Sequence, residues 1–317
     1  MKPIYPFSLI IPALVAVWTP PGFAGTDPAS APRIKADRTT LVDLTQSGDQ
    51  LVAVGERGVV LSSRDGGVSW SSYATPTNRT LTSVTFVDKS TLIAVGHGGV
   101  MLRSEDGGQN WKRIVIDNVN QDSILGVLNL GEGRVIAYGA FGMFLESVDG
   151  GRNWKRRAII DAQFDRHISQ IVLVGNKLLM VGESGTLAIS NDGGENWKRL
   201  STGYEGSYFG AVALKQGAML IYGMRGNLFR SADGGATWQK IPLPITSTIN
   251  AGAIDEKGRI VLVGNNGLLM TSTDNGINFS VSHTPEGRPL SAARFVKDDQ
   301  IAYVGYMSAG RVDALKH

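Results

Sequence analysis

The sequence predicts an all-β fold, a β-propeller of seven blades, and three observations support this prediction. The chain holds 40 glycines among 317 residues but only 12 prolines, which is typical of a turn-rich globular protein. A motif of the form Ser-x-Asp-Gly-Gly-x-x-Trp recurs at intervals of 41 or 43 residues. Between its copies lie short apolar segments bounded by glycine, which indicate β-strands joined by hairpins. A period near 42 with four short strands is typical of propeller blades.

The first 24 residues are predicted to be a signal peptide. Lys2 supplies a positive charge, an apolar run follows over residues 7–18, and residues 22–24 give the small-x-small pattern of a cleavage site. The apolar run contains Pro12 and is too short to span a bilayer as a helix. We therefore expect an exported protein, periplasmic or secreted, with no transmembrane anchor after cleavage behind Ala24.

The repeated motif is predicted to form the turn between the third and fourth strands of each blade. There the aspartate can accept backbone N–H bonds, the glycines can adopt positive φ, and the aromatic residue can pack between blades. Its spacing does not match an EF-hand, so we expect a structural role and no metal. The six aspartates and their aromatic partners are Asp65 and Trp70, Asp106 and Trp111, Asp149 and Trp154, Asp192 and Trp197, Asp233 and Trp238, and Asp274 and Phe279.

We label the strands of a blade A to D from the centre outward. In the second blade we expect strand A over residues 81–87, strand B over 92–95, strand C over 100–104, and strand D from Trp111 onward. The same apolar pattern recurs in every period, which predicts the same strand order in every blade.

The ends of the chain predict how the ring closes. A seventh apolar run lies at residues 301–305, but a seventh aspartate would fall at Leu315, two residues before the end. The last blade should therefore lack strand D. Within the N-terminal segment 25–37, residues 31–36 fit as the missing strand, which would close the ring formed by residues 38–317 and remove its open edges.

The motif is the Asp-box, or BNR repeat, of sialidases and other β-propellers. Over about residues 38–313 the chain resembles the photosystem II stability and assembly factor family, whose members are seven-bladed lumenal propellers. The resemblance implies a non-enzymatic assembly chaperone that binds a membrane-protein precursor through an arginine-rich patch. We expect the protein to be a monomer. Family members also occur in bacteria without photosynthesis, so the expected client is a membrane protein or an envelope complex. The chain has no cysteine and so lacks the lipidated cysteine of cyanobacterial members.

Two connections between blades depart from the repeat and are candidates for the binding patch. Each is two residues longer than the others, at 112–123 and 155–167, and we expect both on one side of one face. Their basic residues are Lys112, Arg113, Lys155, Arg156, Arg157 and Arg166. Guanidinium groups pair well with carboxylates, so an acidic peptide segment is the expected ligand. The alternative is that these residues only protect an edge strand, because Lys198, Arg199 and Lys240 occupy the same register without an insertion.

Composition and motifs speak against most enzyme classes. Without cysteine there is no disulfide, thiolate zinc site or thiol nucleophile, and the four histidines have no ligand spacing. A net charge of +3 does not indicate nucleic-acid binding, and no cofactor motif is present. The alternative function is an Asp-box glycoside hydrolase, sialidase-like, or a lectin, for which Glu56 and Glu183 near the channel mouth could supply facing carboxylates. Turn capping is the competing interpretation of these two residues.

Overall fold

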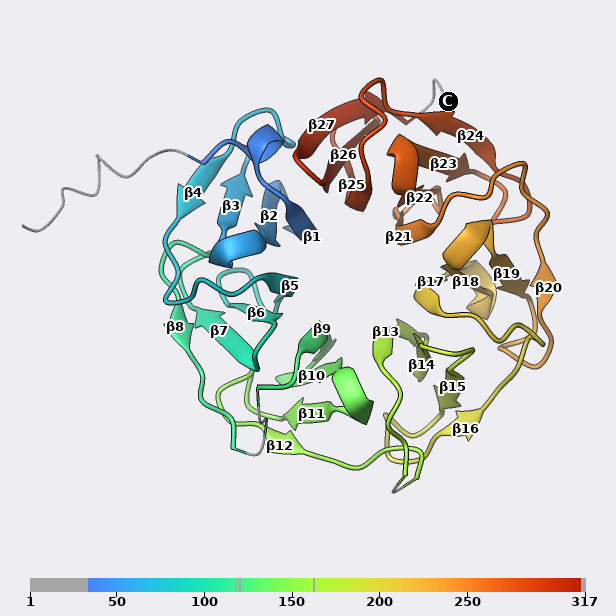
Figure 1. Ribbon diagram of the computed structural model, residues 1–317, viewed down its shortest axis with the longest axis horizontal. Coiled ribbons are helices and arrows are strands. Elements are labelled where there is room, and N and C mark those ends of the chain that lie inside the picture. Colours follow the sequence, from blue (N-terminus) through green and yellow to red (C-terminus); the bar gives the residue numbers. More distant parts are fainter. Residues whose placement is uncertain (1–33, 118, 120, 162, 315–317) are drawn as a thin grey trace, which may run out of the picture. The chain divides into compact units, whose positions relative to one another are not determined.

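A computed structural model describes residues 34–117, 119, 121–161 and 163–314 (Figure 1). The chain separates into two compact units, Met1–Arg33 and Ile34–His317, and all described residues belong to the second. The predicted signal peptide and most of the segment 25–37 lie outside the described residues. Among the residues described, no helix is long and apolar enough to cross a membrane.

The second unit consists of seven antiparallel sheets arranged around a centre, which confirms the seven-bladed propeller (Figure 1). The innermost A strands are β1 (Leu41–Ser47), β5 (Leu81–Phe86), β9 (Ile124–Gly131), β13 (Ile168–Val174), β17 (Tyr208–Ala213), β21 (Ile249–Ile254) and β25 (Leu290–Val296). The B strands are β2 (Gln50–Gly55), β6 (Leu92–Gly96), β10 (Arg134–Gly139), β14 (Lys177–Gly182), β18 (Met219–Gly223), β22 (Ile260–Gly264) and β26 (Gln300–Gly305).

The outer half of each blade is shorter. The C strands are β3 (Val60–Ser63), β7 (Val100–Ser104), β11 (Phe144–Ser147), β15 (Leu187–Ser190), β19 (Leu228–Ser231), β23 (Leu268–Ser272) and β27 (Ser308–Asp313). The D strands are β4 (Ser71–Tyr73), β8 (Lys112–Arg113), β12 (Lys155–Arg156), β16 (Lys198–Arg199), β20 (Gln239–Lys240) and β24 (Ser280–His283). Short 3-10 turns complete the secondary structure: η2 (Ala36–Arg38), η3 (Glu56–Gly58), η4 (Ala140–Gly142), η5 (Lys215–Gly217), η6 (Met224–Gly226) and η7 (Asn265–Gly267).

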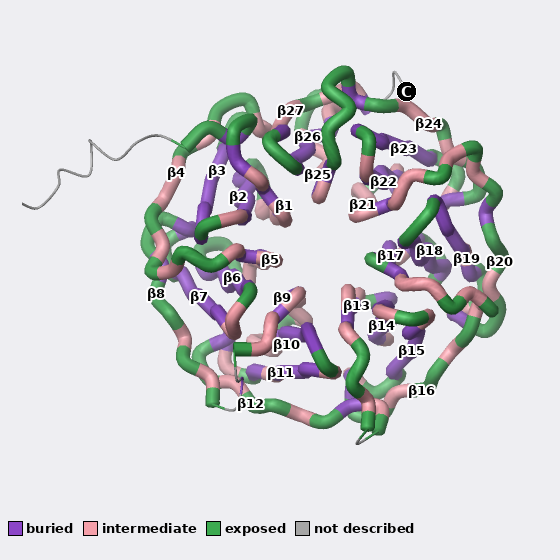
Figure 2. The backbone as a smooth tube through the Cα atoms, in the orientation of Figure 1, coloured by how far each residue is buried: buried purple, intermediate pink, exposed green. Residues whose placement is uncertain are grey.

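The hydrophobic core is divided into clusters that lie between neighbouring blades. Apart from β27, the B and C strands are buried along nearly their whole length, whereas the A strands bury only part of theirs (Figure 2). Each Asp-box aromatic packs in such a cluster, as Trp111 does beside Val52 and Val60 of the preceding blade. This confirms the predicted packing role, and it means that the aromatic of one blade fixes the position of the blade before it.

The Asp-box turns are built as the sequence predicts. In the fourth blade, the buried Ser190 hydroxyl donates to Asp192 Oδ1 over 2.8 Å and accepts the N–H of Gly194 over 2.7 Å. Asp192 in turn accepts the N–H of Asn196, and hydrogen bonds from the backbone and side chain of Asn196 and from Ser190 lower its pKa to about 2. The serine–aspartate pair recurs in the other five boxes. The six aspartates are thus structural, because their oxygens are occupied by the turn itself.

The seventh blade differs from the others. Among the described residues its sheet has only three strands, β25, β26 and β27, and the ring closes where β1 packs against β25 and β26. Of the predicted closing strand, residues 31–33 lie outside the described residues. The remaining residues form no strand: Ile34 and Lys35 are unpaired, and Ala36 begins η2, which packs against β27.

The turns between strands B and C share a left-handed backbone position. Its φ lies near +55° at Arg57, Phe141 and Arg225, and it is +46° at Met307. In the second blade the same position is Gly98, the residue for which this conformation costs least. These turns lie on one face together with the D–A connections, while the A–B hairpins and C–D turns lie on the other.

Candidate functional site

The predicted basic residues lie on the outer edge of two adjacent blades. Lys112 and Arg113 form β8, and Lys155 and Arg156 form β12, which follow one another along the rim (Figure 1). All four side chains are exposed, because a two-residue edge strand has its only strand partner on the inner side. We refer to Lys112, Arg113, Lys155 and Arg156 as the basic rim.

Arg157 does not belong to this exposed group. Its guanidinium donates to Glu146 Oε2 over 2.6 Å and pairs with Glu195 over 2.8 Å, and it lies 5.8 Å from the centre of the Phe144 ring. A further bond to the carbonyl of Gly194 links it to the next blade. Burial works to raise the pKa of Glu146, but hydrogen bonds from Arg157 and Arg134 outweigh this effect and lower it. Arg157 therefore holds the third and fourth blades together.

Arg166 lies on the face beside the rim, in the connection between the third and fourth blades. Its side chain is about half exposed, and its ion pair with the neighbouring Asp165 is long, at 3.9 Å. Its backbone carbonyl accepts the N–H of Gly142, which fixes this part of the connection against η4. Arg166 is thus accessible, but the structure places it on a different element from the basic rim.

Two features beside the basic rim, the exposure of Val115 and the ion pair of Arg199, were not predicted from the sequence. Val115 follows β8 and is 85% exposed, so an apolar side chain stands next to the cations. In the fourth blade, Arg199 of β16 donates to Asp161 over 2.7 Å and lies over the Phe164 ring. Asp161 comes from the same connection as Arg166. Because the Asp161 carboxylate pairs with Arg199, its negative charge lies at β16 and not at β12.

The two glutamates considered for a hydrolase are engaged in turns. Glu56 Oε1 accepts the N–H of Thr40 over 3.1 Å, and Glu183 Oε2 accepts the N–H of His167 over 3.2 Å. In both blades the carboxylate therefore caps the strand A that enters beside the B–C turn. Among the residues that the model covers, no group of three His, Asp or Glu side chains could hold a metal ion.

Comparison with known proteins gives one family. The family model described as "Photosynthesis system II assembly factor YCF48" matches residues 33–136 and 127–241 of this chain. No curated protein sequence matches the chain.

Solved structures share the fold at low sequence identity. A structure described as YCF48 bound to D1 peptide has a TM-score of 0.71 and 19% identity, and the match covers 86% of this chain and 92% of that one. YCF48 from Cyanidioschyzon merolae has the same TM-score and identity, with 87% and 96% covered. A GH74 xyloglucanase from Xanthomonas campestris has a TM-score of 0.72 and 14% identity, covering 89% of this chain and 53% of that one. At these identities the likeness shows the propeller fold.

Proposed function

We propose, on the premise that this chain belongs to the photosynthesis system II assembly factor YCF48 family, that it binds a peptide segment of a membrane-protein or envelope-complex client. The family is one of assembly factors and not of enzymes, and the chain is not an enzyme. A peptide ligand is supported by the structure of YCF48 with D1 peptide. We infer the chemistry of the client segment from the surface of this chain, and its compartment from the predicted signal peptide.

The basic rim is the surface that we assign to the client, and its exposure is the observation that carries the assignment. The ammonium and guanidinium groups of Lys112, Arg113 and Lys155 project from edge strands into solvent, next to the exposed Val115. An acidic segment with an apolar residue matches this surface in charge and in polarity. Arg166 on the adjacent face can extend the contact, whereas Arg157 is already paired within the fold.

Charge reversal tests the basic rim directly. We would compare a Lys112→Glu, Arg113→Glu, Lys155→Glu variant with a control that carries Lys89→Glu, Lys198→Glu and Lys240→Glu, which changes the charge equally. Two of the control residues lie on edge strands in the same register. Arg157 is left intact, because its reversal would place a third carboxylate against Glu146 and Glu195 and would break its ion pairs with both. A photo-crosslinker in place of Val115 would record the client in the native envelope.

The expected result is a specific crosslinked protein that is lost in the rim variant and retained in the control. Circular dichroism would check that both variants fold. Equal crosslinking by the two variants would contradict the rim as the binding surface and would favour edge protection as the role of these residues.

Export is the second part of the proposal. It is supported by residues 1–24, whose charge, apolar run and small-residue ending match a secretory signal. Expression of the full chain followed by cell fractionation and intact-mass measurement should give a periplasmic or secreted protein beginning at Gly25. An unprocessed chain in the cytosol would contradict export.

A further inference from the structure

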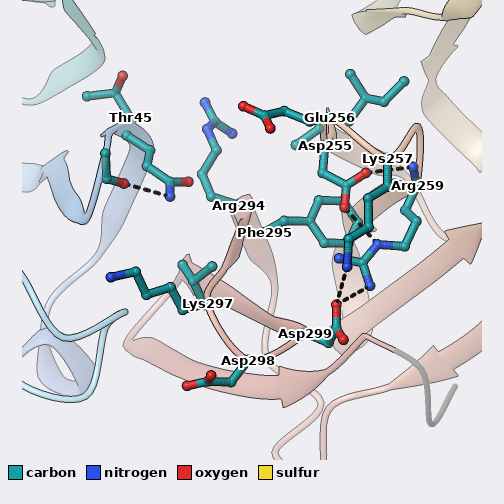
Figure 3. Close-up of a pocket in the computed structure, with 15 residues that line it drawn as sticks. Thr45, Asp255, Glu256, Lys257, Arg259, Arg294, Phe295, Lys297, Asp298 and Asp299 are labelled. Carbon is teal, nitrogen blue, oxygen red and sulfur yellow. Dashed lines mark hydrogen bonds and ion pairs between the residues drawn. The ribbon is translucent and has the colours of Figure 1, made fainter.

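A cavity of about 660 Å³ lies on the face formed by the A–B hairpins, between the sixth, seventh and first blades (Figure 3). The hairpin β21–β22, the hairpin β25–β26 and the turn after β1 supply its walls. The basic rim belongs to the second and third blades, so this cavity is separate from the proposed client surface. What it can bind depends on which of its charged groups are already satisfied.

Three of the four basic side chains that line the cavity have acidic partners. Arg259 donates to Asp255 over 2.7 Å and to Asp299 over 2.8 Å, and its guanidinium lies 5.0 Å from the centre of the Phe295 ring. Lys257 pairs with Asp299 over 3.2 Å. A fourth pair joins Lys297 to Asp49 over 2.7 Å. These groups form the walls of the cavity and hold its hairpins together (Figure 3).

Arg294 is different. Its guanidinium donates one hydrogen bond, over 2.7 Å, to the carbonyl of Ala293, and no ion pair joins it to any acidic group among the described residues. In Figure 3 it stands in the open middle of the cavity, between Thr45 and Glu256. A guanidinium carries five N–H donors, so most of those of Arg294 remain available to a ligand in the cavity that it lines.

Arg294 also reaches the narrow central channel. It lines this second cavity, of about 150 Å³, together with Asp43 and Tyr222. Burial raises the pKa of the Tyr222 hydroxyl, and the positive charge of Arg294 partly opposes that rise. The guanidinium therefore stands where the wide cavity narrows into the channel, and a ligand group small enough to enter this neck would meet it first.

We propose that this cavity binds a carboxylate, with Arg294 as the group that holds it. The planar guanidinium fork matches the two oxygens of a carboxylate. The cavity is lined by equal numbers of acidic and basic residues, and Glu256 and Asp298 repel a doubly charged phosphate more strongly than a carboxylate, so an anion with a single charge fits it better. The carboxylate can be an acidic side chain or the terminus of a peptide, and the same chemistry serves both.

The test uses protein labelled with 15N-arginine, in which the Nε–H signal of Arg294 reports binding. Four probes would be titrated: an N-acetylated, C-amidated alanine tetrapeptide with one glutamate, N-acetyl-tetraalanine with a free terminus, the fully amidated neutral tetrapeptide, and inorganic phosphate. We would compare the wild type with Arg294→Lys, which keeps the charge without the fork, and Arg294→Gln. Lys89→Gln on the same face is the control, because Lys89 is exposed and lies outside the cavity.

A saturable shift with either carboxylate peptide, and none with the neutral one, would support the proposal, and the two peptides distinguish side chain from terminus. In the arginine variants, binding would be followed on uniformly 15N-labelled protein through the amide signals of the cavity hairpins. Affinity should fall on the order of tenfold in Arg294→Gln, less in Arg294→Lys, and remain unchanged in Lys89→Gln. The proposal is overturned if phosphate alone binds, if the neutral peptide binds equally well, or if Arg294→Gln leaves the affinity unchanged.

Discussion

The six blades that carry an Asp-box and the seventh that lacks one are held to their neighbours in different ways. In the six, a buried or half-buried aromatic side chain from the C–D turn packs against the blade before it, as Trp111 does. The seventh blade contributes no such aromatic, and its cluster with the sixth contains Ile301, Tyr303 and Ala314. There Arg259 crosses to Asp299 and covers the Phe295 ring. Where the repeated turn is absent, a charged contact takes its place and a cavity remains beside it.

The largest effect on stability is expected when the aromatic side chain of an Asp-box is removed. Trp111→Ala should lower the free energy of unfolding by about 3–5 kcal/mol, because Trp111 is only 7% exposed and its loss leaves a void between two blades. Urea denaturation would measure the change. Phe295→Ala in the seventh blade, where the ring is only half-buried, should cost clearly less. Equal losses would mean that the two kinds of junction do not differ in this respect.

A smaller effect is expected at the charged contact of the seventh blade. Arg259→Met should destabilise the protein by about 1–2 kcal/mol, because it leaves the largely buried Asp255 carboxylate without its partner. Lys257→Met is the matched control, since Lys257 pairs with the same Asp299 but is 69% exposed, and it should change stability by less than about 0.5 kcal/mol. If both variants unfold at the same urea concentration, the contact of Arg259 is not what joins these blades.

The smallest effect concerns how stability depends on pH. Burial works against the charge of Asp106, but hydrogen bonds from Asn110, Ser104 and Gln109 outweigh it and hold its pKa at about 2. The pKa in the unfolded chain is about 3.9, so the folded state favours the charged form. This contribution is present above about pH 4 and is lost as the pH falls toward 2.

Urea midpoints between pH 5 and pH 2.5 should therefore decline for the wild type and decline less for Asp106→Asn. The variant should be less stable than the wild type at pH 5 and approach it at low pH. Parallel curves for the two proteins would show that Asp106 does not contribute through its charge.

The sequence predicts the repeated part of this molecule well, because every blade carries the same local signals. Strand C of the second blade, residues 100–104, is predicted without error, and strand A ends one residue earlier than expected. The motif predicts the bonds of Ser104 and Asp106, since each partner lies within a few residues of the other. The spacing of residues in the sequence is therefore enough to predict a contact when both partners lie within a few residues of each other.

Contacts between distant positions could not be predicted in this way. Arg157 belongs to the same Lys-Arg run as Lys155, yet it pairs with Glu146 of a neighbouring strand and with Glu195 of the next blade. Arg259 and Asp299 are 40 residues apart and belong to different blades. The pattern of basic residues locates the rim. Whether an arginine finds an acidic partner, as Arg157 does, or none among the described residues, as Arg294 does, depends on how the blades are placed around the ring.

The B–C turns have a further consequence for how this protein can change over time. One turn position, with the same left-handed backbone, carries arginine at residues 57 and 225, phenylalanine at 141 and methionine at 307, while the B strand before it stays buried in each of these blades. Basic, aromatic and aliphatic side chains are all accepted there because none of them enters the core. The ring thus offers a set of surface positions that can be substituted one at a time. New binding specificities can therefore evolve while the propeller fold is kept.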